Sequence, residues 1–345
     1  MRIALDATYS VGDELSGVGV YSREILEGLA AAHPESRFRW CFRPHRWIRS
    51  FQYPAPRNSA RGMFGETWML PPKPDLFHGL NQRMPSLRFR RSVCTFHDLF
   101  VMTGDYSSPE FRERFTRQAR EAAARADLII TVSAFTASQI EFLLKVENTR
   151  LRVIHHGVRV LPQTTVQREP IVLHVGAVQH RKNIVRLVRA FERIETPWRL
   201  VLAGSAGGYG AAEALDAIAS SSARDRIEVT GYVSAAHLAS LYARASVFAF
   251  PSLDEGFGMP VLEAMSRGIP VLASTRSALP EVCGDAALLV DALSTDEIAE
   301  GLKRLTEDED ETGRLREEGL RRASQFTWTE AVGKTWNVYR ETAGQ

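Results

Sequence analysis

The chain has 345 residues, 44% of them hydrophobic and 24% charged, and its net charge is +2 at pH 7. These values are ordinary for a globular protein with two domains, and no apolar run approaches the roughly 18 residues of a membrane-spanning helix. The three cysteines are few, odd in number and far apart. They argue against a disulfide framework or a metal cluster and indicate a reducing compartment, the cytoplasm.

The first half of the chain alternates predicted strands and helices. Residues 2–6 (RIALD) predict a first strand rather than a signal peptide, followed by a loop with Gly12, Gly17 and Gly19 and a helix at 20–32. Open α/β sheets bind ligands at the carboxyl ends of their strands, so we expect this loop to approach a ligand. It lacks the third spaced glycine of a dinucleotide fingerprint. Further strands are expected at 37–42, 75–78, 91–96, 128–132 and 151–154, and further helices at 108–126 and after Ser133, which can cap one.

Positive charge is concentrated in this half. Residues 1–160 hold seven more basic than acidic side chains, whereas residues 161–345 hold five fewer. Such an excess can meet anionic lipid headgroups, an anionic acceptor or nucleic acid, or it can be an ordinary solvated surface rich in arginine. Residues 44–61 combine arginine with aromatic residues (HRWIRSFQY), which is typical of a surface segment touching a membrane or acceptor, or of an irregular packed segment.

The second half repeats the alternation after a polar, proline-bounded stretch at 161–170 that we interpret as a linker. Strands are expected at 171–175, 200–203, 227–229, 247–250, 269–273 and 287–290, with helices between them and a solvated helix end at 307–311. This pattern predicts an α/β protein with a parallel, doubly wound sheet in each half. In residues 326–340, a helical stripe is formed by Trp328, Val332, Trp336 and Tyr339. This stripe requires a hydrophobic partner, most simply another helix of the same chain.

The most informative stretch is 252–274 (SLDEGFGMPVLEAMSRGIPVLAS). A glycine-broken acidic turn leads into a helix with Pro260 at its first position and an apolar face, and Gly268 can end that helix. Free backbone N–H groups and a helix N-terminus suit an anion. Glu255 in the loop and Glu263, expected in the first helical turn, would repel an anion, so we expect both to face hydroxyl groups. A sugar nucleotide offers both chemistries; the alternative is an ordinary loop with an acid favoured by the helix dipole.

Residues 176–183 (GAVQHRKN) follow the strand at 171–175. Asn183 can cap the next helix, which places Arg181 and Lys182 at a helix N-terminus, where cations are unfavourable to the dipole. This placement is reasonable if an anion binds beside them. The alternative is that Arg181 and Lys182 are two ordinary surface cations. His97 ends another strand beside Asp98 and is either structural or functional. Metal binding is not expected, because His155 and His156 are adjacent and no aspartate pair is present.

Together these residues resemble the retaining glycosyltransferases of family 4, and the resemblance runs nearly end to end. Its most specific part is EGFGMPVLEAM, which fits the E-x7-E motif from Glu255 to Glu263, and GAVQHRKN comes next. Weaker matches are TFHDL, TVSAFT, GYVS and HHGV, where His156 departs from the asparagine that is frequent in the family. The family implies the GT-B fold, with two Rossmann-like domains facing each other across a cleft: an acceptor-binding domain at 1–160, a nucleotide-sugar-binding domain at 170–325, and a helix at 326–345 that packs on the N-terminal domain.

The resemblance also implies roles for individual residues. Arg181 and Lys182 would bind the donor diphosphate and stabilise the leaving group, Glu255 would contact the transferred sugar, and Glu263 would bind the ribose. His97 would lie near the reacting sugar. The other implied donor-binding residues are Gly17 and Gly19, which approach phosphate and acceptor, Asn183, Tyr232 and Val233 near the base, and Gly256, Phe257, Gly258, Met259, Pro260 and Val261 of the glycine-rich turn.

The implied reaction needs no cofactor and no metal. The diphosphate leaves, the acceptor attacks from the same face, and the departing phosphate accepts its proton, while domain closure excludes water. Likeness to mannosyltransferases of surface polysaccharides favours GDP-mannose over UDP-sugars as co-substrate. It also favours a glycan or lipid-linked acceptor, with peripheral contact to the anionic inner face of the membrane and no nucleic-acid partner. The alternatives are a sugar-nucleotide epimerase of the same fold and a non-catalytic nucleotide-binding protein. A nicotinamide oxidoreductase is disfavoured because the glycine fingerprint is missing.

Overall fold

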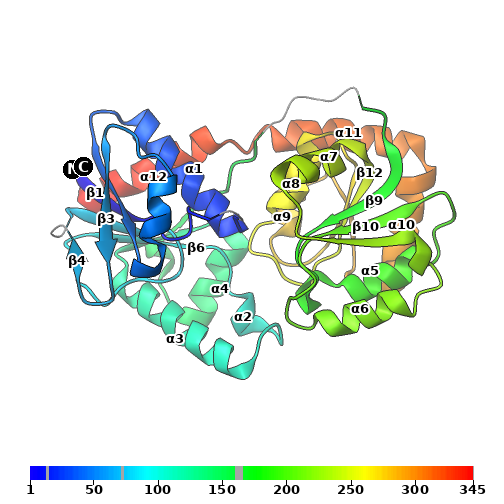
Figure 1. Ribbon diagram of the computed structural model, residues 1–345, viewed down its shortest axis with the longest axis horizontal. Helices are drawn as coiled ribbons and strands as arrows, with labels where there is room; N and C mark the ends of the chain where they lie inside the picture. The colour runs from blue at the N-terminus through cyan, green and yellow to red at the C-terminus, as the bar shows by residue number, and fades with distance from the viewer. Residues whose placement is uncertain (13–14, 71–73, 160–165, 345) are drawn as a thin grey trace. The chain divides into compact units, whose positions relative to one another are not determined.

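The computed structural model describes residues 1–12, 15–70, 74–159 and 166–344. These form two compact units (Figure 1). Unit 1 comprises Met1–Thr103, Pro109–Gly157 and Phe326–Gln345, and unit 2 comprises Gly104–Ser108 and Val158–Gln325. Each unit is an α/β sheet with its own hydrophobic core, which confirms the predicted fold class.

Unit 1 contains an eight-stranded sheet among its described residues, with the strand order β4-β3-β2-β1-β5-β6-β7-β8. All neighbouring strands are parallel except β3 and β4. The strands are β1 Arg2–Asp6, β2 Arg37–Phe42, β3 Ser59–Phe64, β4 Met69–Leu70, β5 Leu76–Gly79, β6 Ser92–Phe96, β7 Leu128–Thr131 and β8 Leu151–Val153. The helices are α1 Gly17–Ala32, α2 Phe100–Thr103, α3 Pro109–Arg125, α4 Ala134–Leu144 and α12 Trp328–Ala343, with short 3-10 helices η1 Pro44–Arg46, η2 Ile48–Gln52 and η3 Asn148–Arg150.

Both faces of the unit 1 sheet are buried. Ile3 and Leu5 of β1 belong to a cluster that includes residues of α1 and α12, whereas Ala4 between them belongs to a second cluster with residues of α3 and α4. Since successive side chains of a strand point to opposite faces, this alternation places helices on both sides of the sheet. Burial on both faces explains the unbroken apolar run Ile3–Leu5 in the central strand β1.

Helix α12 packs against α1, so the predicted apolar stripe has a helix of the same chain as its partner (Figure 1). Tyr339 is fully buried, and Val332 lies so close to Gly28 that a Cβ atom there would come within 2.4 Å of Val332 Cγ2. Trp336 stacks on His33 with ring centroids 3.7 Å apart. The last helix of the chain thereby completes the core of unit 1.

Unit 2 contains a six-stranded, entirely parallel sheet with the order β11-β10-β9-β12-β13-β14 among its described residues. All six predicted strands of the second half are present: β9 Glu169–Val175, β10 Arg199–Ala203, β11 Ile227–Gly231, β12 Ala245–Phe250, β13 Val271–Ser274 and β14 Leu288–Val290. The helices are α5 Ile184–Phe191, α6 Ala211–Ala219, α7 Ala235–Arg244, α8 Met259–Ser266, α9 Leu279–Cys283, α10 Thr295–Glu307 and α11 Glu309–Ala323, with 3-10 helices η4 His180–Lys182 and η5 Arg224–Arg226.

Some local predictions need correction. Gly17 and Gly19 of the predicted first loop are helical, because α1 begins at Gly17 and the Ser16 side chain caps it by accepting from the Gly19 N–H. Residues 44–61 are not wholly irregular, since they contain η1, η2 and the start of β3. The acidic run 307–311 contains the predicted solvated helix end, since α10 ends at the exposed Glu307, and it also begins α11, which the Asp308 side chain caps.

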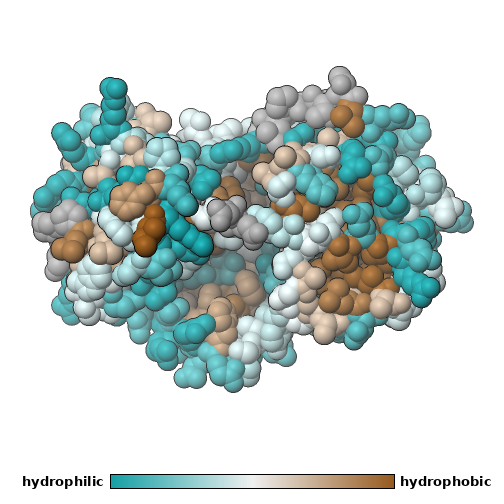
Figure 2. All heavy atoms as spheres, in the orientation of Figure 1, coloured by the Kyte–Doolittle hydropathy of each residue, from teal (hydrophilic) through white to brown (hydrophobic). Residues whose placement is uncertain are grey.

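Of the predicted linker at 161–170, residues 161–165 lie outside the described part of the chain, and Glu169 and Pro170 belong to β9. In the part of the chain that the structure describes, no helix combines the length and the apolar character needed to cross a membrane. On the face shown in Figure 2, apolar side chains of unit 1 form small areas separated by polar ones.

Candidate functional site

The strand order of unit 2 places its ligand-binding edge. From β9 the chain adds β10 and β11 on one side of the sheet and then returns to add β12, β13 and β14 on the other. The carboxyl ends of β9 and β12 therefore flank a topological switch point, where open α/β sheets bind ligands. The loops that leave these two ends are GAVQHRKN and the glycine-rich turn, so topology brings the two most specific sequence motifs together.

Three charged side chains meet at this switch point. Glu255 Oε1 lies 2.6 Å from Lys182 Nζ and 2.8 Å from an Arg181 guanidinium nitrogen. The Lys182 ammonium also lies 4.3 Å from the centre of the Phe250 ring. Lys182 and Glu255 are buried. Gly176 leaves room for this lysine, because a Cβ atom there would come within 3.1 Å of Lys182 Cε. Its φ of +152° is also a conformation that residues with side chains rarely adopt.

The electrostatics of Glu255 are dominated by its two cations. Burial alone would raise its pKa, but the charges of Arg181 and Lys182 outweigh burial and lower the pKa to about 2. The sequence predicts that Glu255 faces hydroxyl groups, whereas its Oε1 atom here faces both cations. The predicted pair of cations at one spot is present, and Glu255 is its counter-ion.

Asn183 holds the same region by a different contact from the one predicted. It occupies the N-cap position of α5, but its φ of +61° is left-handed and its side chain makes no capping hydrogen bond. Instead Nδ2 donates to the carbonyl oxygens of Pro251 at 3.0 Å and Ala292 at 2.6 Å. Asn183 therefore ties the loop after β9 to the loop after β12 and the segment after β14.

Glu263 lies one residue deeper in its helix than expected. Because α8 starts at Met259, Pro260 is its second residue and Glu263 its fifth, outside the first turn. The Tyr242 hydroxyl donates a 2.8 Å hydrogen bond to Glu263 Oε2. Burial raises the pKa of this carboxyl, while the hydrogen bond from Tyr242 acts in the opposite direction. An acid this far from the helix N-terminus gains little from the helix dipole.

The remaining predicted donor residues differ in accessibility. The Val261 side chain is fully buried and its N–H donates to the Gly258 carbonyl at 3.0 Å, so Val261 offers no free group. Gly258 has φ of +111° and precedes α8, which explains the glycine. Gly256 and Phe257 are buried, whereas Met259 and Pro260 are partly exposed. Tyr232 (52% exposed) and the partly exposed Val233 follow β11, which β10 separates from β9.

His97 belongs to unit 1, as do Gly17 and Gly19. It is buried, and its Nε2 lies 2.9 Å from the Leu80 carbonyl oxygen. A carbonyl only accepts, so Nε2 carries the proton. Burial lowers the pKa of His97 to about 4, which keeps the ring neutral near pH 7. Tyr21 contacts its ring edge-on at 4.7 Å, and the His156 ring stacks on it at 5.4 Å.

Sequence reasoning missed two side chains at these sites. Tyr242 lies in the last turn of α7, and no spacing in the sequence connects it to Glu263. His174 lies within β9, where a polar residue in an apolar strand was an available signal. Its Nδ1 lies 2.9 Å from the Ala249 carbonyl oxygen, and burial lowers its pKa to about 4.

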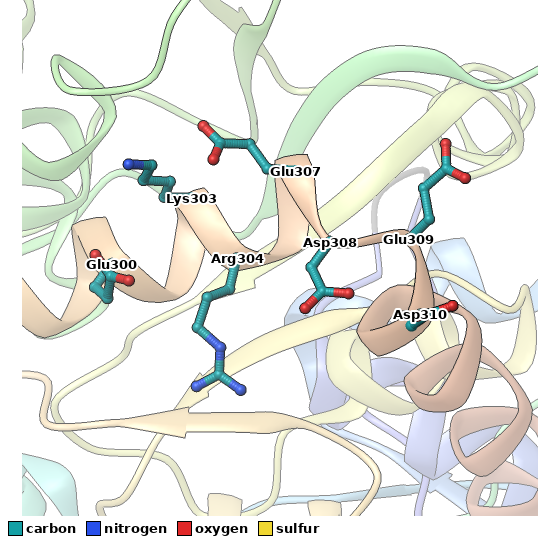
Figure 3. Close-up of a pocket in the computed structure, with 7 residues that line it drawn as sticks. All are labelled: Glu300, Lys303, Arg304, Glu307, Asp308, Glu309 and Asp310. Atoms are coloured by element: carbon teal, nitrogen blue, oxygen red, sulfur yellow. The ribbon is translucent and has the colours of Figure 1, made fainter.

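A surface hollow elsewhere in unit 2 contains none of the predicted site residues. It lies where α10 meets α11 (Figure 3) and is lined by Glu300, Lys303, Arg304, Glu307, Asp308, Glu309 and Asp310. Its polar side chains take part in local contacts, such as the 2.6 Å ion pair between Arg304 and Glu311. Nothing in its chemistry connects it to the switch point.

Comparison with known proteins identifies the family. A model of glycosyltransferase family 4 matches residues 15–160, and a model of the glycosyl transferases group 1 matches residues 162–322. O-antigen chain mannosyltransferase B of Escherichia coli is 33% identical over 295 residues, covering 80% of this chain and 77% of that protein. This chain is a family 4 glycosyltransferase. It is therefore a transferase enzyme, as the sequence predicted.

Other relatives of this glycosyltransferase agree. The MMP alpha-(1->4)-mannosyltransferase of Mycolicibacterium hassiacum is 33% identical over 245 residues, or 68% of this chain and 57% of that protein. Sucrose-phosphate synthase from Thermosynechococcus elongatus has a TM-score of 0.78 over 99% of both chains at 23% identity. Anabaena HepE in complex with UDP-glucose has a TM-score of 0.75 at 18% identity, over 99% of this chain and 100% of that one. The structural likenesses show the shared fold, and with it the expected GT-B class.

Proposed function

We propose that this glycosyltransferase moves mannose from GDP-mannose to a glycan or lipid-linked acceptor in surface polysaccharide synthesis, with retention of configuration. The choice of mannose is supported by the names of the two relatives described above, which are both mannosyltransferases. GDP is proposed over UDP on the same likeness.

The observation that carries the proposal is the convergence of Arg181, Lys182 and Glu255 at the switch point of unit 2. Arg181 and Lys182 place two cationic groups beside the buried carboxylate of Glu255. A donor diphosphate supplies negative charge there, and each charge-assisted hydrogen bond to it contributes about 1.5–3 kcal/mol. We therefore assign Arg181 and Lys182 to the diphosphate and Glu255 to the sugar attached to it.

The proposed reaction follows from that assignment. The bond between the anomeric carbon and the diphosphate oxygen breaks, and its electron pair stays on the diphosphate. Arg181 and Lys182 stabilise the developing charge. The acceptor hydroxyl forms the new bond on the same face, and its proton passes to the departing diphosphate oxygen. The role of His97 near the sugar stays a prediction from the family resemblance. In the structure, the hydrogen bond from its Nε2–H to the Leu80 carbonyl oxygen fixes the orientation of the neutral ring.

Isothermal titration with GDP and UDP tests the donor class. GDP is expected to bind more tightly, and tighter binding of UDP would overturn the GDP assignment. Incubation with GDP-mannose and mannose-terminated acceptors tests the reaction. The expected product is an α-mannoside by NMR, whereas an epimerised nucleotide sugar formed without acceptor would point to the alternative reaction.

We also propose that unit 1 contacts an anionic membrane at the cytoplasmic face. Ile48 is 83% exposed and Phe51 is 60% exposed in η2, and the exposed Arg49 lies between them in sequence. An apolar tip beside basic side chains suits an anionic bilayer surface. Wild-type protein is expected to co-sediment with vesicles containing phosphatidylglycerol more than with phosphatidylcholine vesicles, and Ile48→Glu with Phe51→Glu is expected to abolish the difference. Equal sedimentation with both vesicles would contradict the contact.

A further inference from the structure

The contact between Tyr242 and Glu263 assigns a role to a residue outside the recognised motifs. Tyr242 lies on α7 and donates its hydroxyl hydrogen to Glu263 Oε2 of α8 across 2.8 Å. We propose that Tyr242 is a positioning residue for the nucleotide-sugar donor: it fixes one oxygen of the Glu263 carboxylate, so that the other oxygen serves the ribose hydroxyls. This inference rests on the proposed function, because it requires a nucleotide-sugar donor in unit 2.

The direction of the hydrogen bond is settled by the chemistry of the two groups. Burial and the neighbouring Glu263 raise the pKa of Tyr242 well above 10, so the phenol keeps its proton and donates it. The carboxylate accepts, and this bond opposes the effect of burial on the pKa of Glu263. Loss of the hydroxyl would therefore both release the carboxylate and favour its protonated form.

Tyr242 can act as a fixed support because it is itself held by packing. Its side chain is buried, and its ring centroid lies 6.0 Å from that of Phe248 in β12. Its hydroxyl also lies 3.4 Å from the Pro260 carbonyl oxygen at the start of α8. A glutamate held by such a support loses less conformational freedom when a ligand binds, which is the general benefit of preorganisation.

Helix α7 connects this support to the loop expected at the nucleotide base. The helix starts directly after Tyr232 and Val233, where the Ser234 side chain caps it by accepting from the His237 N–H at 3.2 Å. Tyr242 is the seventh residue after Ala235 along the helix, which corresponds to a rise of about 10 Å. One rigid element thus carries the base loop at its start and the support of the ribose acid near its end.

The test uses the dependence of binding on the ribose hydroxyls, which a merely structural residue would not change. Wild type, Tyr242→Phe, Glu263→Gln and the double variant are titrated with GDP, UDP and their 2′,3′-dideoxy forms. The quantity compared is the ratio of the dissociation constants of the dideoxy and the parent nucleotide, for whichever of GDP and UDP binds wild type more tightly. In wild type this ratio is expected to be about tenfold to hundredfold. In Tyr242→Phe this ratio is expected to fall below about threefold, and the double variant should behave like Glu263→Gln alone.

Tyr53→Phe serves as the matched control, since it removes a phenol hydroxyl in unit 1, and it should leave the ratio unchanged. Tyr242→Met is read in the same way as Tyr242→Phe and carries the test if the phenylalanine variant does not fold, as judged by its melting temperature. A Tyr242 variant that keeps the full wild-type ratio, or that weakens both forms of the nucleotide equally, overturns the positioning role. Wild-type protein that binds neither nucleotide overturns the proposed donor site, and this inference with it.

Discussion

Glu255 and Glu263 belong to one motif and are eight residues apart, yet the fold gives them opposite environments. Glu255 is paired with two cations, which lower its pKa to about 2. Glu263 has a neutral phenol as its hydrogen-bond partner, and burial raises its pKa. The difference teaches that the spacing of two acids in a sequence does not define their chemistry; the partners that other elements bring to them do.

The two environments suit different ligand groups. A carboxylate held between cations is part of an ion cluster that a diphosphate can join, whereas a carboxylate held by a phenol is a hydrogen-bond acceptor for hydroxyl groups. Changes to the partners should therefore affect the two glutamates in different ways.

The largest effect is expected for Lys182→Ala. This variant removes a buried charge that contacts Glu255 and, by our proposal, the donor diphosphate. GDP affinity should fall by about tenfold to hundredfold, and turnover should fall by about 100-fold or more because leaving-group stabilisation is lost as well. Calorimetry and initial rates measure both quantities. Lys303→Ala on α10 is the control, and near-wild-type rates for Lys182→Ala would remove the assigned site.

A smaller effect is expected in the pH dependence of stability. The pKa of Glu255 in the folded protein is about 2, below its ordinary value of 4.5, so its stabilising contribution is present above pH 4.5 and is lost as the pH falls toward 2. The pKa of Glu263 is raised, so its ionisation costs stability at neutral pH, and this cost disappears as the pH falls below 4.5. The two glutamates thus act in opposite directions.

Urea unfolding of Glu255→Gln and Glu263→Gln between about pH 3 and 7 measures this difference. Glu255→Gln should lose about 3–5 kcal/mol of unfolding free energy at pH 7, because two cations lose their counter-ion, and the loss should shrink on acidification. For Glu263→Gln, the unfolding free energy of wild type relative to that of the variant should rise on acidification, because wild type no longer bears the cost of ionising Glu263. Parallel pH profiles of the two variants would show that the environments do not differ as described.

Much of the fold could be predicted from sequence because its strands are buried on both faces. Continuous apolar runs, such as 171–175 and 247–250, mark the strands of unit 2 without any knowledge of their neighbours. Strand β3 was missed because SARGMF mixes small, polar and charged residues and so carries no strand pattern. Its parallel pairing with β2 makes it a strand, and that pairing is not visible in the sequence. The extent of α1 was missed because the cap at Ser16 outweighs the low helix propensity of Gly17 and Gly19.

The candidate site was predicted less completely, for a physical reason. The motifs at 176–183 and 252–263 follow neighbouring strands, so their proximity follows from topology. The ion cluster within them does not, since Lys182 and Glu255 are 73 residues apart in sequence. Contacts of this kind are set by side-chain packing, as is the bond between Tyr242 and Glu263. Sequence patterns therefore predicted that the two motifs meet but not the charge pairing between them.

The return of α12 to unit 1 has a consequence for biosynthesis. Residues 158–325 form nearly all of unit 2, so that unit is built almost entirely from one continuous stretch of the chain. Unit 1 must wait, because Val332 and Tyr339 fill its interior and emerge from the ribosome long after its strands. Until then the apolar face of the sheet beside α1 is exposed to water, so we expect the core of unit 1 to be completed only after residues 328–343 are available.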